Sequence, residues 1–529
     1  MPDQHGATSD PANAATPPPA DRRYDPRWTL AACVLGSSMA FIDGTAVNVS
    51  LPVMQRDFGA AVSGLQWVVE AYALMLASLV VVGGGLADRL GVRRMFAIGI
   101  VWFAVASVGC GMAPTLALLI AARVAQGAGA ALLIPGSLAL LSHAYPAAER
   151  GTAIGKWSAF AAMNVAMGPV LGGWLVDQVS WRAVFFINVP MGALVLLLLW
   201  RRVAPVAARG GIRDLDWAGA LLLVLGFGGL IFGLIEQGNL GWTHPAIWSS
   251  LLLFLVAAPL FIWVERRVAS PMLPLQLFRI RTFRGANGIT LLLYAAMGGA
   301  MFFLPLNLIQ VQGFTATRAG LAILPLILIL SVLSRWSGGL IDRVPPRLPL
   351  TLGPLLTAAG YLLYLRTGIG DSYWTTFFPA IVVQGLGMAL SVAPLTTVAL
   401  NAVPERHAGI ASGINNGVSR TASLLAIAVL GVVALLVFEP GLAMQLEALS
   451  LPDALRGQVL AQANRLAAID LPPGATPAQA EAIGQAIKEA FVRSYHVVMG
   501  LAALSAALAA LMAWVTLRVP PGREPDLTG

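Results

Sequence analysis

The chain has 529 residues, of which 57% are hydrophobic and only 11% are charged, and its mean hydropathy is +0.77. Soluble domains carry about 25% charged residues, so the composition excludes an ordinary soluble protein and predicts an all-α membrane protein with many spans. The apolar runs are too long for the strands of a β-barrel. We relate the formal net charge of +8 to membrane topology and lipid contact, and we expect no nucleic-acid partner.

Apolar runs of about 20 residues, the length that crosses a bilayer, follow a polar stretch at residues 1–27 that we expect to be a disordered cytoplasmic tail. The runs predict fourteen spans, near residues 28–50, 65–85, 94–112, 116–141, 152–176, 182–200, 216–236, 246–264, 285–308, 318–341, 347–365, 374–400, 408–437 and 491–517.

The spans divide into two groups of six with an extra pair between them. We predict a first six-helix bundle at 28–202, a linker with two extra spans at 203–284, a second six-helix bundle at 285–518 and a cytoplasmic tail at 519–529. The second bundle includes a periplasmic segment, 439–490, that we expect to form one or two short surface helices rather than a separate domain.

Lysine and arginine indicate the orientation, because cytoplasmic loops are enriched in them. With the amino terminus inside, 23 of the 33 Lys and Arg residues fall in inner segments and 8 in outer ones. Only Arg123 and Arg420 remain within the membrane. The bias predicts that both termini are cytoplasmic.

A short inner loop occurs twice. Residues 84–93 and 338–347 both read Gly-Gly-Leu, then Asp-Arg, then a final Arg, at an offset of 254 (338 − 84). Two such loops, each between apolar helices, are typical of the homologous halves of a transporter. We expect both loops to take part in gating the inner side. The residues that we assign to these gating loops are Gly85, Asp88, Arg89, Arg93, Gly339, Asp342, Arg343 and Arg347.

Two opposite charges lie inside the apolar spans, Asp43 in the first and Arg123 in the fourth. An ionisable residue there is costly and usually faces a water-filled cavity where it functions. Asp43 lies 9 residues before Pro52 and Arg123 lies 9 after Pro114 (52 − 43 and 123 − 114), so both lie about 13 Å below the outer surface. This shared depth permits a direct or water-linked pair, and we assign both residues to proton coupling. A permanent structural bridge is the alternative.

Further polar residues extend the candidate site. Glu70 is a third candidate for proton coupling, although a water-exposed carboxylate at the interface would explain its place in the second span as well. Arg420 lies deep in the thirteenth span, where cargo contact and helix–helix bonding are equally plausible. The residues that we assign to a substrate cavity are Asn48, Gln126, Asn415, Asn416 and Arg420.

The fifth span carries a glycine-rich helix face. Gly168, Pro169, Gly172 and Gly173 combine small residues at helical spacing with a proline, a pattern that allows close helix packing and a bend. The two cysteines, Cys33 and Cys110, both lie in apolar runs, so we expect neither a disulfide framework nor a metal site.

Four of these motifs, in this order, give a family resemblance that covers about 28–518. The first-span stretch from Asp43, the loop 85–94, the Arg-x-x-Gln-Gly pattern at 123–127 and the Gly-Pro-x-x-Gly-Gly pattern at 168–173 resemble the major facilitator superfamily, in its fourteen-span drug:proton antiporter branch of the QacA/EmrB type. Asn164 departs from that pattern, which usually has another glycine there.

The resemblance implies two six-helix bundles that rock about a central cavity, in the inner membrane of a bacterium. It also implies that Asp88 caps a helix start in the opposite bundle when the inner side is closed, and by symmetry we expect the same of Asp342. We expect export of lipophilic small molecules in exchange for protons, without a cofactor, in contact with membrane lipid. An adaptor protein for passage across an outer membrane is left open. Import of a small organic solute and lipid flipping are the alternatives on the same fold. An enzyme is disfavoured, because no His-Glu-x-x-His, Gly-x-Ser-x-Gly or Walker pattern occurs.

Overall fold

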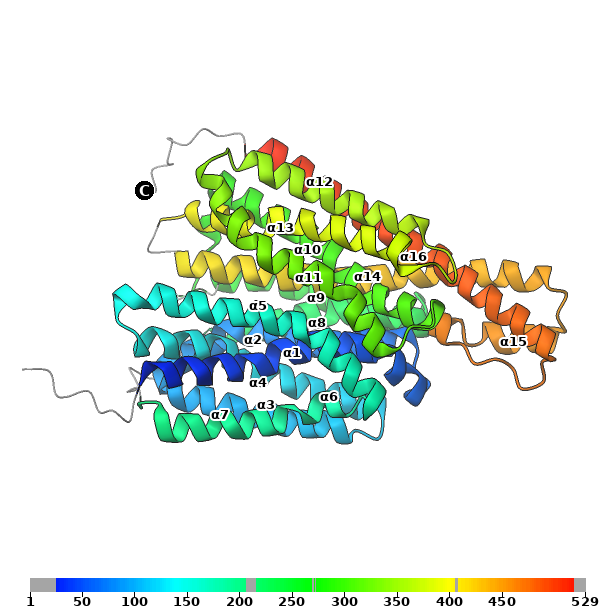
Figure 1. Cartoon of the computed structure of the whole chain (residues 1–529), viewed down its shortest axis with the longest axis horizontal. Coiled ribbons are helices and arrows are strands. Elements are labelled where there is room, and N and C mark those ends of the chain that lie inside the picture. Colours follow the sequence, from blue (N-terminus) through cyan, green and yellow to red (C-terminus); the bar gives the residue numbers. More distant parts are fainter. Residues whose placement is uncertain (1–24, 206–215, 269–270, 272, 405–407, 518–529) are drawn as a thin grey trace, which may run out of the picture.

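The computed structural model describes residues 25–205, 216–268, 271, 273–404 and 408–517. They form helices that lie side by side along the long axis of the molecule (Figure 1). Fourteen helices in this part of the chain are long and apolar enough to cross a membrane, which confirms the predicted number of spans. Residues 1–24 of the predicted amino-terminal tail and the predicted carboxy-terminal tail, 519–529, lie outside the described residues, whereas the last residues of the first tail, 25–27, form the start of α1.

The first bundle packs seven helical segments into six spans, with α6 and α7 sharing one span. Its helices are α1 (Pro26–Phe58), α2 (Val62–Leu90), α3 (Val92–Met112), α4 (Leu116–Ala144), α5 (Ala147–Gln178), α6 (Ala183–Phe186) and α7 (Asn188–Arg202).

The second bundle is built in the same way from six long helices and one short one. Its helices are α10 (Arg281–Leu306), α11 (Ala316–Gly338), α12 (Arg347–Leu363), α13 (Phe378–Asn401), α14 (Ala408–Ala448), α15 (Asp453–Leu460) and α16 (Pro477–Thr516). We call the end with the first turn of α1 and the last turn of α16 the inner end, and the end with α15 the outer end (Figure 1).

The two extra spans, α8 (Trp217–Leu240) and α9 (Pro245–Glu265), lie beside the seam between the bundles. Ile231 and Ile235 of α8 are buried in one cluster with Leu74 of α2 and Leu424 of α14. α9 packs on α8, and much of its surface is exposed. α8 therefore contacts both bundles, whereas α9 presents an apolar face to lipid.

Local sequence signals set the helix ends. Asp25 accepts a hydrogen bond from the Arg27 backbone at the start of α1, at 2.8 Å, and Thr115 and Thr315 cap α4 and α11. Thr476 and Gln479 form a capping box at the start of α16. Side-chain acceptors at these positions satisfy backbone donors that have no partner within the helix.

Glycine at the inner end of α2 allows a close helix contact. A Cβ placed on Gly83 would lie 2.1 Å from the Ala131 carbonyl oxygen of α4, and one on Gly127 of α4 would lie 2.4 Å from the Tyr72 carbonyl oxygen. Any side chain at either position would force the helices apart. These two contacts bring α2 and α4 close together from the polar cluster described below toward the inner end.

The long outer segment is mostly an extension of two spans. The apolar runs predict spans that end near 437 and resume near 491, but α14 continues to Ala448 and α16 already begins at Pro477. Hydropathy misses these turns because their outward faces are polar. Leu446 and Ile487, on the two extensions, are buried in the main core. Only α15 and a 3-10 turn, Ala463–Ala468, lie between the two helices.

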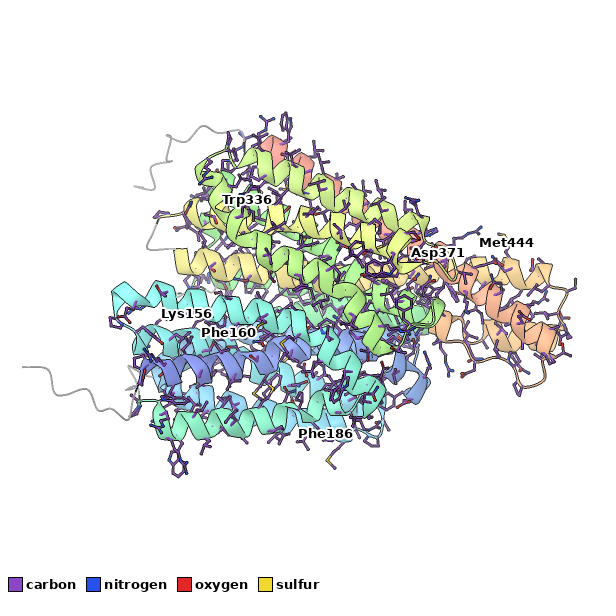
Figure 2. The ribbon with its side chains drawn as sticks, in the orientation of Figure 1. Lys156, Phe160, Phe186, Trp336, Asp371 and Met444 are labelled. Carbon is purple, nitrogen blue, oxygen red and sulfur yellow. The ribbon has the colours of Figure 1, made fainter. Side chains whose placement is uncertain are left out.

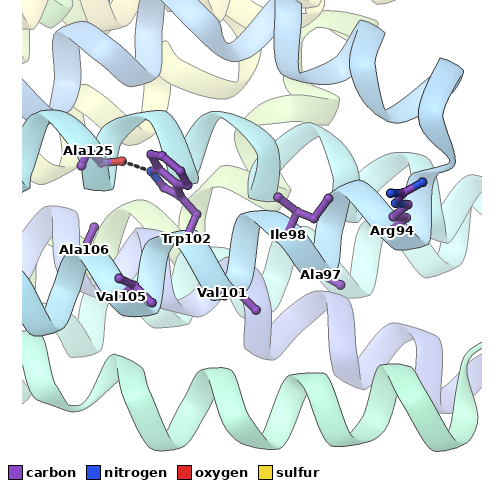
Figure 3. Close-up of a pocket in the computed structure, with 8 residues that line it drawn as sticks. All are labelled: Arg94, Ala97, Ile98, Val101, Trp102, Val105, Ala106 and Ala125. Carbon is purple, nitrogen blue, oxygen red and sulfur yellow. Dashed lines mark hydrogen bonds between the residues drawn. The ribbon is translucent and has the colours of Figure 1, made fainter. Parts of the chain in front are cut away.

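A groove with apolar walls runs along the outside of the first bundle, between α3 and α4 (Figure 3). Its volume is about 600 Å³. Trp102 and Val105 on its wall are exposed, and the Trp102 indole N–H donates to the Ala125 carbonyl oxygen at 2.7 Å. This bond satisfies the indole where lipid offers no acceptor. The groove lies away from the seam between the bundles and faces the membrane.

Candidate functional site

A buried ion pair joins α1 to α4 in the first bundle. Asp43 is 1% exposed and Arg123 is 1% exposed. The Arg123 Nη1 atom donates to Asp43 Oδ2 at 2.5 Å. The structure thus brings together the two charges that share a predicted depth. Because removal from water is costly for both ions, the remaining polar atoms around them decide whether the pair is stable.

Gln126, one helical turn from Arg123, forms hydrogen bonds to both members of the ion pair. Its amide nitrogen donates to Asp43 Oδ1 at 2.9 Å and to Ser107 Oγ at 2.9 Å, while its oxygen accepts from Arg123 Nη1 at 2.6 Å. Asn188 of α7 also donates to Ser107, at 3.3 Å. The sequence predicts Gln126 in the substrate cavity, but the structure places it within the first bundle, 0% exposed.

Arg123 is also held from the side of α2. Its Nε atom donates to the Val68 carbonyl oxygen at 2.9 Å, and its guanidinium lies 4.2 Å from the centroid of the Tyr72 ring. Cation–π contacts of this kind strengthen when the cation is desolvated. Arg123 therefore connects α1, α2 and α4. A change in the charge of Asp43 would alter the contacts among these three helices.

A cavity of about 230 Å³ lies between the bundles beside this pair. Its walls include Arg123, Tyr72 and Asn48 from the first bundle and Arg420 from α14 of the second. Asn48 and Arg420 thus lie where a substrate cavity is predicted. Asp43 does not line the cavity, because Arg123 and Gln126 surround its carboxylate.

The other two predicted cavity residues lie elsewhere on α14. Asn415 is buried and donates to Thr290 Oγ1 at 2.7 Å and to Asn287 Oδ1 at 3.4 Å, both on α10. These bonds join two helices within the second bundle. Asn416 is exposed and donates to the Ser412 carbonyl oxygen of its own helix at 3.0 Å. Neither residue lines the cavity.

Glu70 is fully buried on α2, and neither of its carboxylate oxygens has a hydrogen-bond partner within the described residues. Gln66, one turn before it, donates to the Ile427 carbonyl oxygen of α14 at 2.6 Å. Leu74, one turn after it, packs on α8 and α14. Helical spacing therefore places Glu70 on the α2 face that meets α8 and α14. The predicted alternative, a water-exposed carboxylate at the interface, does not fit this burial.

At the outer end, the carboxylate of Asp177 links the two bundles. Asp177, in the last turn of α5, accepts from the backbone nitrogens of Ala316 and Thr317 at 3.1 and 2.8 Å, and from Thr317 Oγ1 at 2.5 Å. It therefore caps the start of α11, where an anion is favoured by the helix dipole. We call this set of contacts the outer clamp.

The glycine-rich face of α5 makes the outer clamp possible. A Cβ on Gly173 would lie 2.4 Å from the Ala316 carbonyl oxygen, and one on Gly320 of α11 would lie 2.2 Å from the Pro169 carbonyl oxygen. On its other side, α5 places Gly168 against Thr45 and Gly172 against Ala46 of α1. Asn164 donates to Ser38 Oγ of α1 at 2.5 Å, so it adds a hydrogen bond to the packing of α5.

Within the described residues, several hydrogen bonds join the two bundles toward the outer end. Besides the outer clamp, Gln310 donates to Gln55 at 2.8 Å, and Gln66 donates to α14. Toward the inner end, Lys156 and Phe160 on α5 are exposed (Figure 2). A Cβ on Gly413 or Gly417 of α14 would have no neighbour within 4 Å. Hydrogen bonds at the outer end, together with exposed side chains and open space toward the inner end, are typical of an inward-open conformation.

Comparison with known protein families supports this architecture. The sequence model of the family described as Major Facilitator Superfamily matches residues 33–428. The chain belongs to the major facilitator superfamily. It is 38% identical over 440 residues to the multidrug resistance protein Stp of Mycobacterium tuberculosis (strain CDC 1551 / Oshkosh), covering 82% of this chain and 80% of that protein. The methylenomycin A resistance protein of Streptomyces coelicolor is 34% identical, over 80% of this chain and 89% of its own.

Solved structures of other proteins share the fold. A bacterial homologue of the human lysosomal transporter Spinster aligns with a TM-score of 0.66 at 18% identity, covering 94% of this chain and 99% of that one. The inward-open xylose transporter XylE from E. coli aligns with a TM-score of 0.55 at 14% identity, covering 93% and 97%. At these identities the likeness concerns the major facilitator fold alone.

The gating loops of this major facilitator protein are described only in part. The side chains of Asp88 and Asp342 lie outside the described residues. Arg93 donates to the Trp200 carbonyl oxygen at 3.4 Å, and the Arg347 guanidinium lies over the Trp514 ring. Both of these contacts stay within one bundle. The predicted gating contacts across the inner end remain a prediction.

Sequence reasoning missed Asp177, Ser107 and Tyr72. Asp177 follows Gly173 by one helical turn, but its contact with the start of α11 depends on how the two bundles pack, so no local signal predicts its role. Ser107 and Tyr72 carry no such signal, because a serine or tyrosine in an apolar span is common. Only the packing of α1, α2, α3 and α4 brings them to the ion pair.

Proposed function

We propose that this protein exports lipophilic small molecules from the cytoplasm in exchange for protons. Two of its relatives are named as a multidrug resistance protein and a methylenomycin A resistance protein, and a third as a lincomycin resistance protein. The cavity between the bundles has mostly apolar walls with a few polar groups, a lining that suits lipophilic cargo. The protein acts as a transporter rather than as an enzyme.

The observation that carries the proton-coupling proposal is the Asp43–Arg123 pair beside the cavity. A proton that arrives on Asp43 Oδ2 removes the negative charge that holds Arg123 Nη1. Arg123 cannot release its own proton, so its guanidinium must find another acceptor. Because Arg123 forms part of the cavity wall, protonation of Asp43 changes the cavity surface and promotes cargo release.

Glu70 is the second proton site in this scheme. A buried carboxyl without a hydrogen-bond partner is stable only when it is neutral, so Glu70 carries a proton in the conformation described here. It lies where α2 meets α8 and α14, a contact that changes when the bundles rock. Exposure of Glu70 in the opposite conformation would let it release its proton, which links protonation to the position of the bundles.

The driving force suffices for drug export. A proton-motive force of about 150 mV supplies about 3.5 kcal/mol per proton. Since about 1.4 kcal/mol corresponds to a factor of ten, one proton per cycle can sustain a gradient of roughly 300-fold for neutral cargo. No cofactor is needed in this scheme. The scheme also works with or without an adaptor protein that continues export across an outer membrane.

Alternating access follows from two sets of contacts at opposite ends. The outer clamp stabilises the inward-open conformation described here. The gating loops, through Asp88 and Asp342, cap helix starts at the inner end once that end closes. Cargo binds from the cytoplasm in the first conformation and leaves in the second. In this scheme the outer clamp favours the inward-open conformation, and the gating loops favour the outward-open one.

The topology gives a direct prediction. If both termini are cytoplasmic in a bacterial inner membrane, the segment with α15 is periplasmic. A cysteine at Ala478, which is exposed at the start of α16, should react with a membrane-impermeant thiol reagent in intact spheroplasts. The native Cys33 and Cys110 are both 0% exposed, so background labelling should be low. Labelling of Ala478→Cys only after lysis would reverse the orientation.

The function is tested with a drug-susceptibility panel in a host that lacks its own efflux pumps. The wild-type chain should raise resistance to a subset of lipophilic compounds and lower their accumulation, and Asp43→Asn should not. Increased accumulation would instead indicate import. Unchanged susceptibility, with lipid moved between leaflets in reconstituted vesicles, would indicate a flippase.

A further inference from the structure

Two arginines line the central cavity, and they differ in their partners. Arg123 is paired with Asp43. Arg420 enters the cavity wall from α14, and within the described residues no carboxylate or hydrogen-bond acceptor contacts its guanidinium. The two arginines and the single Asp43 carboxylate therefore give the cavity region one uncompensated positive charge.

No acidic side chain lines this cavity within the described part of the chain. The Asp43 carboxylate is enclosed by Arg123 and Gln126, and the Glu70 oxygens are buried away from it. A cationic cargo would therefore meet one like charge and no counter-ion. An anionic cargo would meet a guanidinium whose donors are free, and guanidinium binds carboxylate, sulfonate and phenolate oxygens with charge-assisted hydrogen bonds.

The rest of the wall suits a flat apolar body with a polar edge. Phe41, Leu76 and Ile134 are apolar, the Tyr72 ring already stacks on Arg123, and Asn48 adds an amide that can donate or accept. Because these groups come from the first bundle and Arg420 comes from the second, a cargo that touches both would connect the bundles. As long as Arg123 stays paired with Asp43, the charge on the cargo would be recognised by α14.

We propose that Arg420 is the cargo-recognition residue of this transporter and selects lipophilic anions, that is, aromatic compounds with a carboxylate, sulfonate or phenolate group. This proposal rests on the proposed export function and adds the substrate class to it. It also assigns a role to the intramembrane charge that the coupling scheme does not use.

The test compares two fluorescent probes that differ mainly in charge, 8-anilinonaphthalene-1-sulfonate (anionic) and N-phenyl-1-naphthylamine (neutral), on the purified full-length protein in nanodiscs. Arg420→Gln should weaken binding of the sulfonate at least tenfold, which corresponds to about 1.4 kcal/mol, and leave binding of the neutral probe within about twofold. Arg420→Lys, which keeps the charge without the planar fork, should retain part of the preference. Arg366→Gln, at an exposed arginine of the outer end, is the control for loss of charge alone.

The outcomes separate this proposal from the function on which it rests. Equal loss of both probes in Arg420→Gln would indicate a structural arginine and would overturn the proposal, as would an unchanged affinity for the sulfonate. In either case the wild-type protein would still lower drug accumulation in cells. If the wild type exports no compound of any charge, the proposed function fails, whatever the probes show.

Discussion

Asp43→Asn is expected to abolish proton-driven export and to destabilise the protein. The substitution keeps the shape of the side chain but removes the charge that balances Arg123, which is 1% exposed. Breaking a buried ion pair from one side costs about 3–5 kcal/mol, because the other charge stays buried and unpaired. Drug resistance should fall to that of the empty host, and thermal unfolding in detergent should shift to lower temperature.

The matched control is the double variant Asp43→Asn with Arg123→Gln. It removes both charges and keeps hydrogen-bonding groups near Gln126 and the Val68 carbonyl oxygen. Thermal stability should recover most of the loss, because no unpaired ion remains, while export should stay absent. Recovery of both stability and export in the double variant would show that the pair is a permanent structural bridge, which contradicts the coupling role.

Asp177→Ala should shift the conformational equilibrium toward outward-open. The substitution removes the outer clamp on α11, in which two backbone nitrogens and one hydroxyl donate to the carboxylate. A typical net hydrogen bond contributes about 0.5–1.5 kcal/mol. Because Asp177 is exposed and solvent screens it, we expect a total of about 1–2 kcal/mol, or a change of roughly 5- to 30-fold in the ratio of the two conformations.

Spin labels at Val179 and Leu321, which are exposed near the outer ends of α5 and α11, report this shift as a longer distance population. Asp371→Ala is the control. Asp371 accepts from the Gly368 backbone nitrogen at 2.5 Å, so it caps a turn at the same end of the molecule but within one bundle. If Asp177→Ala leaves the distance distribution as it is in the wild type, the outer clamp does not hold the gate.

The architecture can be predicted from the sequence because the number of spans and the depth of a residue in its span depend only on short stretches of the chain. Apolar runs define fourteen spans, and the count holds in the structure. The depth of Asp43 and Arg123 along their helices is set by a fixed rise per residue, so two independent positions could be compared, and the structure joins them in an ion pair.

The contents of the cavity could not be predicted in the same way. The sequence predicts Gln126 and Asn415 in the cavity, because polar side chains in spans often face water, but each points into its own bundle and bonds to a neighbouring helix. The rotation of a helix about its axis depends on all its neighbours, and polar residues satisfy internal partners as readily as cavity water. The outer clamp needs the relative position of two bundles, which no local pattern specifies.

The central claim is that cargo leaves the cytoplasm as protons enter it, and that the Asp43–Arg123 pair couples these two movements. It is tested most directly in proteoliposomes with a pH indicator sealed in the lumen, using the compound to which the chain confers most resistance. With an acidic lumen, we predict that the cargo accumulates inside while the lumen pH rises with it. Nigericin should stop both changes, and Asp43→Asn should show neither. Accumulation that is equally fast without a pH gradient, or that leaves the lumen pH unchanged, would contradict proton antiport.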